Sequence, residues 1–308
     1  MPFFSVVIPL YNKEKFIGNT LQSVLGQTFS DFEVVVVDDG STDSSAATVK
    51  QFTDSRIQYY SKENEGVSTA RNFGINAAAS DFIAFIDADD FWYPDFLQTM
   101  HQNIQRFPDQ MVFSAAIEVE TARNLIPAQY SIQKTGVCEL VDFFEASCKE
   151  AVIWTSAAVF HKDVFQKCGV FDMAIKSGQD TDLWMRIGLV YKVVFCWKVL
   201  ARYVYDDNSL SKNMAYTATK INFSKFSELE KSNSKLKKYL DLNRFSLAIK
   251  SKIHNDPTGF NNFYHAIDLN GISWKKKILL KLPPFLLKRL IRVKRQLAEV
   301  GLGNSVFK

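Results

Sequence analysis

The 308-residue sequence lacks any apolar run of the roughly 18 to 20 residues that a membrane-spanning helix needs. Its first residues, Met1–Ser5, carry no basic charge ahead of the first apolar stretch, so they do not resemble a secretory signal. We therefore expect the chain to stay in the cytosol.

Cysteines are few, and a phosphate-binding loop is missing. The four cysteines form no CxxC pair and no metal-finger pattern, so we expect reduced thiols and no disulfide framework. No glycine-rich loop follows the first predicted strand, which argues against a nucleotidyltransferase or a dinucleotide-dependent enzyme.

Acidic residues are absent from one long segment. Between Asp268 and Glu299 the chain has nine basic residues and no acidic one. The whole chain has a net charge of +4, so the remainder, with 28 basic and 33 acidic residues, is mildly acidic. A hydrophobic content of 47% with 23% charged residues indicates a folded globular chain of one large domain, or one domain with an appendage.

Apolar runs alternate with helical patterns through the first hundred residues. Predicted strands cover residues 5–10, 32–37, 57–60 and 82–86. Predicted helices cover residues 13–25, a segment that begins near Ser44, and a segment that Asn64–Asn72 leads into and that continues through Ala79. This alternation is typical of βαβ units and predicts an α/β fold with a mostly parallel sheet flanked by helices.

Polar residues follow three of these strands, in Pro9–Asn12, Asp38–Asp43 and Asp87–Asp90. Ligands of parallel sheets bind outside the carboxyl ends of the strands, so these segments are predicted to share one rim. Crowded carboxylates at the edge of a core need a compensating cation, and oxygen ligands suit Mg²⁺ or Mn²⁺. The alternative for Asp87–Asp90 is an acidic turn that faces solvent.

Four motifs in order carry a resemblance to a known family. They are Ser5–Asn12 (SVVIPLYN), Val36–Asp43 (VVDDGSTD), Asn64–Asn72 (NEGVSTARN) and Asp87–Asp90 (DADD). Together they resemble the N-terminal half of the family 2 glycosyltransferases. The resemblance implies a GT-A fold, a nucleotide-sugar donor and inversion at the anomeric carbon.

The resemblance also implies roles for single residues. The donor-binding residues would be Pro9, Tyr11, Asp38, Asp39, Asn64, Gly66, Arg71 and Asp87. Tyr11 would stack on the base, and Asp39 would accept a hydrogen bond from a ring N–H, which favours a UDP-sugar. Asp87 would hold the ribose or the metal shell, and Asp89 would bind the Mn²⁺ or Mg²⁺ that bridges the diphosphate. Alternatives are a loop aromatic for Tyr11, turn support for Asp38 and a solvated Arg71.

A later segment, Gly178–Arg186, resembles the part of the family that carries the catalytic base. Asp180 matches the base, and Asp182 would begin the helix, where a negative charge is favourable. The alternative is that both aspartates are helix caps. Gln179 stands where the family usually has glutamate.

A second departure from the family lies further on. Val204 and Asp206 stand where the family often has arginine and histidine, so Asp206 or Asp207 is a possible metal ligand. Trp154 lies in a predicted strand, 153–160, where it would either stack on an acceptor sugar or pack in the core.

The remaining predictions concern the second half and the tail. A helix is predicted at 95–107, a strand at 111–119 and a variable loop at 120–135. Residues 274–297 form a basic amphipathic segment that Pro283 and Pro284 should break in two. Its aliphatic density favours an anionic membrane surface over nucleic acid or an ordinary solvated helix.

The sequence thus predicts a glycosyltransferase domain over 1–219, with a nucleotide-sugar half (1–110) and an acceptor half (111–219), and a helical extension over 220–308. We expect transfer from a UDP-sugar to a glycan or lipid-linked acceptor in cell-surface polysaccharide biosynthesis, by a peripheral protein of the inner face of the plasma membrane. We expect no nucleic-acid partner. The alternative is a non-catalytic nucleotide-sugar-binding protein, suggested by Gln179 and by the replacements at 204 and 206.

Overall fold

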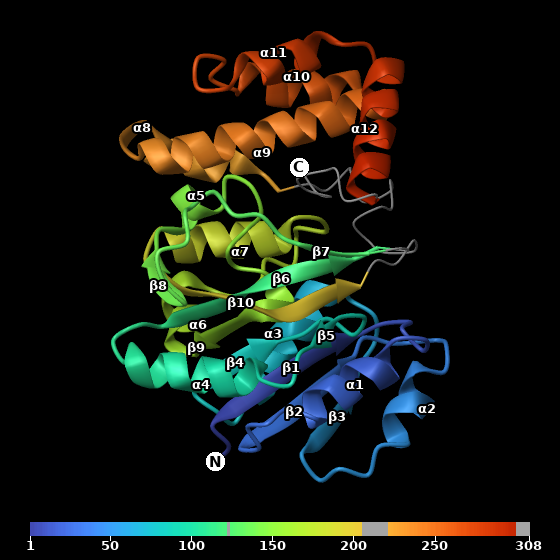
Figure 1. The fold of residues 1–308 in the computed structure, drawn as a ribbon. Helices are drawn as coiled ribbons and strands as arrows, with labels where there is room; N and C mark the ends of the chain where they lie inside the picture. The colour runs from blue at the N-terminus through green and yellow to red at the C-terminus, as the bar shows by residue number, and fades with distance from the viewer. Residues whose placement is uncertain (122–123, 205–220, 300–308) are drawn as a thin grey trace. The chain divides into compact units, whose positions relative to one another are not determined.

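The computed structural model describes residues 1–121, 124–204 and 221–299 (Figure 1). They form two compact units. The sheet unit comprises the described residues of 1–128, 133–143 and 152–221, and the helical unit those of 129–132, 144–151 and 222–308.

The first half of the sheet unit is parallel, as predicted. Its strands follow the order β3-β2-β1-β4, with bounds β1 (Phe4–Leu10), β2 (Phe32–Asp38), β3 (Ile57–Ser61) and β4 (Phe82–Phe85). The connecting helices are α1 (Ile17–Leu25), α2 (Ser45–Lys50) and α3 (Val67–Ala77). Every residue of β1 and β2 is buried, which explains why both strands are mostly apolar. The buried exceptions Ser5 and Glu33 lie side by side, and the Ser5 hydroxyl donates to the Glu33 carboxylate.

The second half of the sheet extends beyond β4. Strand β9 (Ala158–His161) pairs antiparallel with β4 and with β6 (Val112–Glu120), and β6 pairs parallel with β10 (Val193–Val204). Two antiparallel steps restore the original direction, so β6 and β10 run the same way as β1 and β4. Their carboxyl ends therefore lie on the same edge of the sheet as the three predicted polar segments.

Short elements complete this unit. They are β5 (Phe91–Trp92), β7 (Leu125–Pro127), β8 (Cys138–Val141), α4 (Phe96–Arg106), α6 (Asp163–Cys168), α7 (Gln179–Gly188) and the 3₁₀ turn η1 (Thr155–Ala157). Helix α5 (Phe143–Ala146) begins in this unit, and its last three residues belong to the helical unit. The predicted loop at 120–135 contains β7, which pairs with the end of β6. The predicted strand at 153–160 begins only at Ala158, because residues 155–157 form η1.

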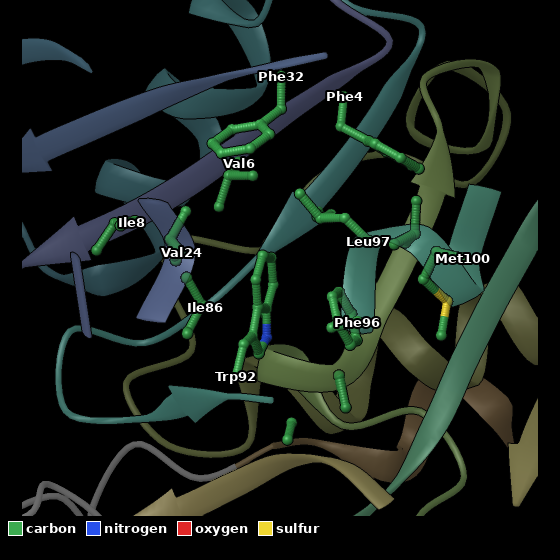
Figure 2. Close-up of a cluster of buried hydrophobic side chains, with 14 of the residues drawn as sticks. Phe4, Val6, Ile8, Val24, Phe32, Ile86, Trp92, Phe96, Leu97 and Met100 are labelled. Carbon is green, nitrogen blue, oxygen red and sulfur yellow. The ribbon is translucent and has the colours of Figure 1, made fainter. Parts of the chain in front are cut away.

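The main core fills the space between the sheet and helices α1 and α4 (Figure 2). Trp92 and Phe96 stack in it at 4.1 Å between ring centroids. On α3, Gly74 lies so close to β1 that an added Cβ would collide with the Val7 side chain. The packing of apolar side chains against the strands supplies most of the stabilisation of this unit.

The helical unit contains α8 (Leu229–Ser232), α9 (Ser234–Ile253), α10 (Pro257–His265), α11 (Trp274–Lys281), α12 (Pro284–Glu299) and the 3₁₀ turn η4 (Phe223–Phe226). The predicted break at Pro283 and Pro284 is present between α11 and α12. Asn233 caps α9 by accepting a hydrogen bond from the Leu236 N–H at 3.0 Å.

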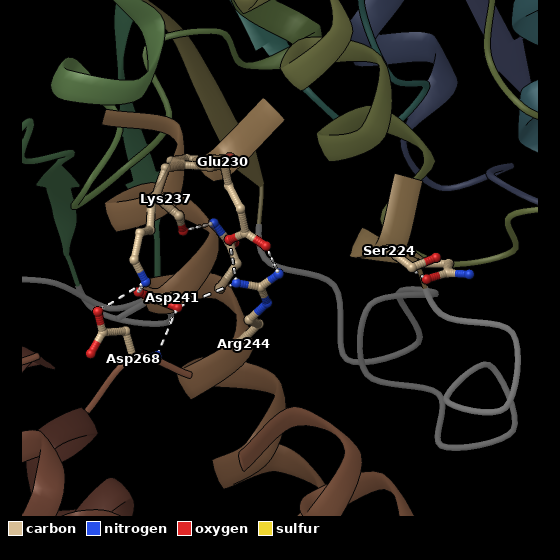
Figure 3. Close-up of polar contacts among 9 residues, drawn as sticks. Ser224, Glu230, Lys237, Asp241, Arg244 and Asp268 are labelled. Atoms are coloured by element: carbon tan, nitrogen blue, oxygen red, sulfur yellow. Dashed lines mark hydrogen bonds and ion pairs between the residues drawn. The ribbon is translucent and has the colours of Figure 1, made fainter. Parts of the chain in front are cut away.

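A partly buried ion-pair network joins α8, α9 and the loop before α11 (Figure 3). The Arg244 guanidinium donates to both carboxylate oxygens of Glu230, at 2.7 and 2.8 Å. Lys237 pairs with Asp268 at 3.0 Å, and the Asp268 N–H donates to Asp241 at 3.2 Å. A bidentate arginine pair fixes geometry, so the network sets how these helices are oriented within the unit.

Candidate active site

The ends of β1 and β2 are tied together at the carboxyl edge of the sheet. The Asp39 N–H donates to the Leu10 carbonyl at 2.8 Å, the Asn12 N–H donates to Ser41 Oγ at 3.1 Å, and the Thr42 N–H donates to Asn12 Oδ1 at 2.8 Å. The predicted convergence of these segments on one rim is therefore present.

Pro9 is a proline inside a central strand. The Val7 carbonyl accepts from Ile86 N–H and the Leu10 carbonyl accepts from Asp39 N–H, so alternate residues of β1 face β4 and β2. Pro9, like Val7, faces β4, but the pairing of β1 with β4 ends at the pair Val7 and Phe85, before Pro9 is reached. The missing N–H of proline therefore costs no ladder hydrogen bond.

Asp38 supports the turn after β2. Its Oδ1 accepts from the Ser41 N–H at 2.8 Å, and its Oδ2 accepts from the Tyr59 hydroxyl at 2.6 Å. Burial and the hydrogen bond to Asp38 raise the pKa of Tyr59 to about 12. The structure thus gives Asp38 the turn-supporting contacts that the sequence left as an alternative.

Asp39 is buried and holds the loop that leads into α3. It accepts from Lys62 Nζ and from the Gly66 N–H, each at 2.7 Å, and from the Glu65 N–H at 3.1 Å. Gly66 begins α3 with a φ of 100°, a conformation that favours glycine. Each carboxylate oxygen can accept two hydrogen bonds, so Oδ2, which binds Gly66, has room for a base N–H.

Two of the remaining predicted donor residues lie exposed beside this loop. The Tyr11 side chain is exposed at the end of β1, and Asn64 is exposed in the loop that Asp39 holds. An exposed ring at the rim is accessible for stacking on a planar base.

Arg71 is buried rather than solvated, which rules out the alternative reading of this residue. Its Nη2 donates to Asp87 at 2.6 Å, and its guanidinium lies 5.2 Å from the centre of the Phe171 ring. Its Nε and Nη1 are also buried, and among the described residues they have no hydrogen-bond partner. Buried donors are normally satisfied, so this guanidinium suits an anionic ligand.

The segment around Phe171 is attached to α3 by a residue to which the sequence assigned no role. The Asn72 amide donates to the Phe171 carbonyl at 2.8 Å and accepts from the Phe171 N–H at 3.0 Å. This reciprocal pair places the chain before α7 beside the arginine helix.

Hydrogen bonds of Asp90 and Ser156 hold the acidic segment in place. The Ser156 hydroxyl accepts from the Asp87 N–H at 3.0 Å and donates to the Asp90 carboxylate, whose other oxygen accepts from the Val204 N–H at 3.1 Å. Burial raises the pKa of Asp90 well above its usual range, and the charges of Asp89 and Asp87 add to this effect. No sequence motif pointed to Ser156, because the residue lies in a turn far along the chain.

Asp89 lies against an ammonium group. Lys13 Nζ is 2.6 Å from Asp89 Oδ2, and the two side chains are 19% and 15% exposed. Burial raises the pKa of Asp89; Lys13 opposes this shift and Asp87 adds to it. Lys13 therefore supplies a positive charge beside Asp89 in this structure.

The carboxylates near the acidic segment bear on whether a divalent ion could bind. Within 1–121, 124–204 and 221–299, no group of three or more His, Cys, Asp or Glu side chains is placed to hold one. Asp87 and Asp89 supply two carboxylates, which fits ions that take further ligands from water and from substrate phosphates. Asp206 and Asp207 lie outside the described residues.

Asp180 lies in the first turn of α7 and is partly buried. The helix begins after Gly178, whose φ is 85°, and Asp180 Oδ1 accepts from the Thr181 N–H at 2.6 Å. This contact fixes the orientation of the Asp180 carboxylate at the start of the helix.

Asp182, by contrast, is fully buried and structural. It pairs with Arg186 at 3.0 Å, and the Arg186 guanidinium donates to the carbonyls of Cys168 and Val170. The pair thereby fixes the turn that precedes Phe171.

Trp154 is half-buried and packs against the main core. Its ring lies 5.4 Å from that of Tyr203, at 75°. Tyr203 immediately precedes Val204, so this aromatic pair lies close to the segment that binds Asp90.

Among the described residues, no helix has both the length and the apolar character needed to cross a bilayer.

Several known proteins are similar to this chain in sequence. Glycosyltransferase GlyA of Streptococcus pneumoniae is 39% identical over 105 residues, which is 33% of this chain and 15% of that protein. Putative glycosyltransferase EpsH of Bacillus subtilis is 36% identical over 121 residues, 39% of this chain and 35% of that protein. The chain thus spans well under half the length of either relative.

A solved structure shows the same fold. TarS of S. aureus, residues 1–349 in complex with UDP-GlcNAc, matches with a TM-score of 0.59 over 85% of this chain and 89% of that one, at 17% identity. The likeness confirms the predicted GT-A fold. A family model described as Glycosyl transferase family 2 matches residues 5–169, more than half of the chain. Motifs, fold and family match agree, and the chain therefore belongs to glycosyl transferase family 2.

Proposed function

We propose that the protein transfers a sugar from a UDP-sugar to a hydroxyl group of a glycan or lipid-linked acceptor, with inversion, in cell-surface polysaccharide biosynthesis. The observation that carries this proposal is the buried Arg71, which pairs with Asp87 through one nitrogen and keeps two buried nitrogens for a ligand. A diphosphate supplies the anionic oxygens that these donors need. The complex of TarS with UDP-GlcNAc supports a UDP-linked donor.

The base of the nucleotide would be recognised by the two strand ends. Tyr11 would stack on uracil, and Asp39 would accept its ring N–H. The hydrogen bonds from Gly66 and Glu65 keep the Asp39 carboxylate oriented, so the base meets an acceptor that is already in place.

Asp180 would act as the general base. Inversion requires one displacement, in which the acceptor oxygen attacks the anomeric carbon while a carboxylate takes its proton. Replacing Asp180 by asparagine should leave donor binding unchanged and reduce turnover by at least about 10³-fold. Asp182→Asn is not a suitable control, because it would also disturb the turn that Arg186 holds. Asp172→Asn, in a preceding exposed turn, is the matched control. Equal turnover of Asp180→Asn and Asp172→Asn would place the base elsewhere.

Asp89, with Asp87 beside it, would hold a Mn²⁺ or Mg²⁺ ion. When bound, the ion supplies Lewis-acid stabilisation of the leaving diphosphate. Arg71 would hold a phosphate oxygen from the other side, and Ser156 and Asp90 would keep the carboxylates in position.

The deciding experiment measures the melting temperature with UDP, GDP and ADP, each with and without Mn²⁺, because a ligand of the folded state raises it by mass action. We expect an increase that is specific to UDP and larger with Mn²⁺. Donor binding without turnover, over a panel of acceptors, would favour the alternative of a non-catalytic nucleotide-sugar-binding protein, for which Gln179 is the motivating departure. An absence of any increase would contradict both.

The basic C-terminal helices support a second part of the proposal, a peripheral site on the inner face of the plasma membrane. Phe285 of α12 is 68% exposed and Trp274 of α11 is 67% exposed, among nine basic residues. Leu280 and Leu287 are buried, so each helix packs through one face and leaves other apolar side chains uncovered.

Vesicle binding tests this part. Each basic residue near an anionic surface contributes about 1 kcal/mol, so the triple variant Lys288→Gln, Arg289→Gln, Arg292→Gln should weaken binding to phosphatidylserine vesicles about 100-fold. Phosphatidylcholine vesicles are the control lipid. Equal binding of the wild type to both lipids would contradict the proposal, and tighter binding to duplex DNA would favour the nucleic-acid alternative.

A further inference from the structure

Lys13 is held beside Asp89 by its own backbone. Its N–H donates to Ser45 Oγ at 2.8 Å. The preceding residue, Asn12, has a φ of 50°, and its N–H and its side-chain oxygen both form hydrogen bonds with the loop after β2. The backbone of Lys13 is therefore fixed, and its Nζ lies 2.6 Å from Asp89 Oδ2.

The two cations beside the acidic segment come from different elements and pair with different carboxylates. Arg71, from α3, pairs with Asp87, and Lys13, from the end of β1, pairs with Asp89. The pair of Lys13 and Asp89 is largely removed from water, with side chains 19% and 15% exposed; in the other pair Arg71 is 5% and Asp87 33% exposed. Charges so placed are weakly screened, so a third cation at Asp89 would repel Lys13 strongly.

Lys13 and a divalent ion would compete for the same carboxylate oxygen. Lysine carries its charge on a flexible stem, whereas the guanidinium of Arg71 is held by its helix and by the Phe171 ring. Lys13 is therefore the cation that can move, and a diphosphate beside Asp89 would offer it a new anionic partner.

We propose that Lys13 is the resident counter-ion of Asp89, that it disfavours binding of a divalent metal alone, and that it turns to the donor diphosphate when metal and donor bind together. This inference rests on the proposed binding of a metal at Asp89. It makes metal and UDP bind cooperatively, because the diphosphate both ligates the metal and neutralises the displaced lysine.

The test measures Mn²⁺ binding to the full chain by calorimetry or electron paramagnetic resonance, with no sugar donor or acceptor present. Lys13→Met removes the charge and keeps the length of the side chain. We expect it to bind Mn²⁺ alone at least about tenfold more tightly than the wild type, and the factor by which UDP enhances Mn²⁺ binding to fall about tenfold. Lys15→Met, at an exposed lysine two residues further on, removes the same charge and should bind Mn²⁺ like the wild type.

A second variant covers the case in which Lys13→Met unfolds. Lys13→Arg keeps the ion pair, and its guanidinium can donate two hydrogen bonds to the Asp89 carboxylate. This variant should therefore bind Mn²⁺ alone more weakly than the wild type. Equal Mn²⁺ binding by the wild type, Lys13→Met and Lys13→Arg would overturn the role of Lys13 while leaving the metal site intact. If no variant bound Mn²⁺ with or without UDP, the proposed metal site itself would be wrong.

Discussion

Replacing Ser156 by alanine removes the hydroxyl that connects Asp87 and Asp90. The hydroxyl is buried and makes two hydrogen bonds, one from the Asp87 N–H and one to the Asp90 carboxylate. Each buried polar group left without a partner costs about 1 to 3 kcal/mol, so we expect the free energy of unfolding to fall by about 3 kcal/mol. The acidic segment should also lose its fixed position, and UDP should bind more weakly.

Ser114 offers a matched control. It lies in β6, is as buried as Ser156, and its hydroxyl has no hydrogen-bond partner among the residues that the structure describes. Ser114→Ala removes the same atom without breaking a hydrogen bond. Its free energy of unfolding should therefore stay within about 0.5 kcal/mol of the wild-type value or rise.

Urea denaturation of the wild type and both variants measures the difference, with the slope against urea checked for constancy. Calorimetric titration with UDP then measures binding at a temperature where all three are folded. If the two variants lost equal stability and bound UDP equally, the hydrogen bonds of Ser156 would not position the acidic segment.

Three further predictions concern stability. Gly74→Ala should lower the free energy of unfolding by about 1 to 3 kcal/mol despite the higher helix propensity of alanine, because its Cβ would collide with Val7; urea denaturation checks this. Tyr59→Phe should destabilise the protein at pH 8, where Tyr59 donates to Asp38, and the difference should shrink between pH 10 and 12: the folded-state pKa of about 12 exceeds the usual 10, so this stabilisation is lost as pH rises. Measuring the free energy of unfolding of the wild type and of Tyr59→Phe at pH 8 and at pH 12 checks whether the difference shrinks. Arg244→Ala leaves a buried carboxylate unpaired and should cost the helical unit about 3 to 5 kcal/mol, which limited proteolysis of that unit would reveal.

The fold of the first half follows from its sequence because each element has a local signal there. Strand β2 contains four consecutive buried valines, and Gly66 precedes α3 at positive φ, where glycine is favoured. The double proline at 283–284 separates α11 and α12 for an equally local reason.

Contacts between segments that lie far apart in the sequence have no such local sequence signal. In the sequence Asp90 is one of several crowded carboxylates and has no role of its own, yet it is buried against Ser156 and Val204, from two later parts of the chain. The pairing of Lys13 with Asp89 depends on the packing of the end of β1 against the segment after β4, and a lysine near a tyrosine looks unremarkable in sequence. Periodicity reports the neighbours of a residue along an element, not its partners across the fold.

The order of strands also bears on how the chain is made. Strand β4 is covered on one side by β1 and on the other by β9, which lies far later in the sequence. A nascent chain that has left the ribosome only as far as β4 therefore presents Phe82–Phe85 as an open apolar edge, a surface prone to pair with other chains. A fragment cut out after residue 110 would therefore lack β9, the strand that pairs with this edge of β4.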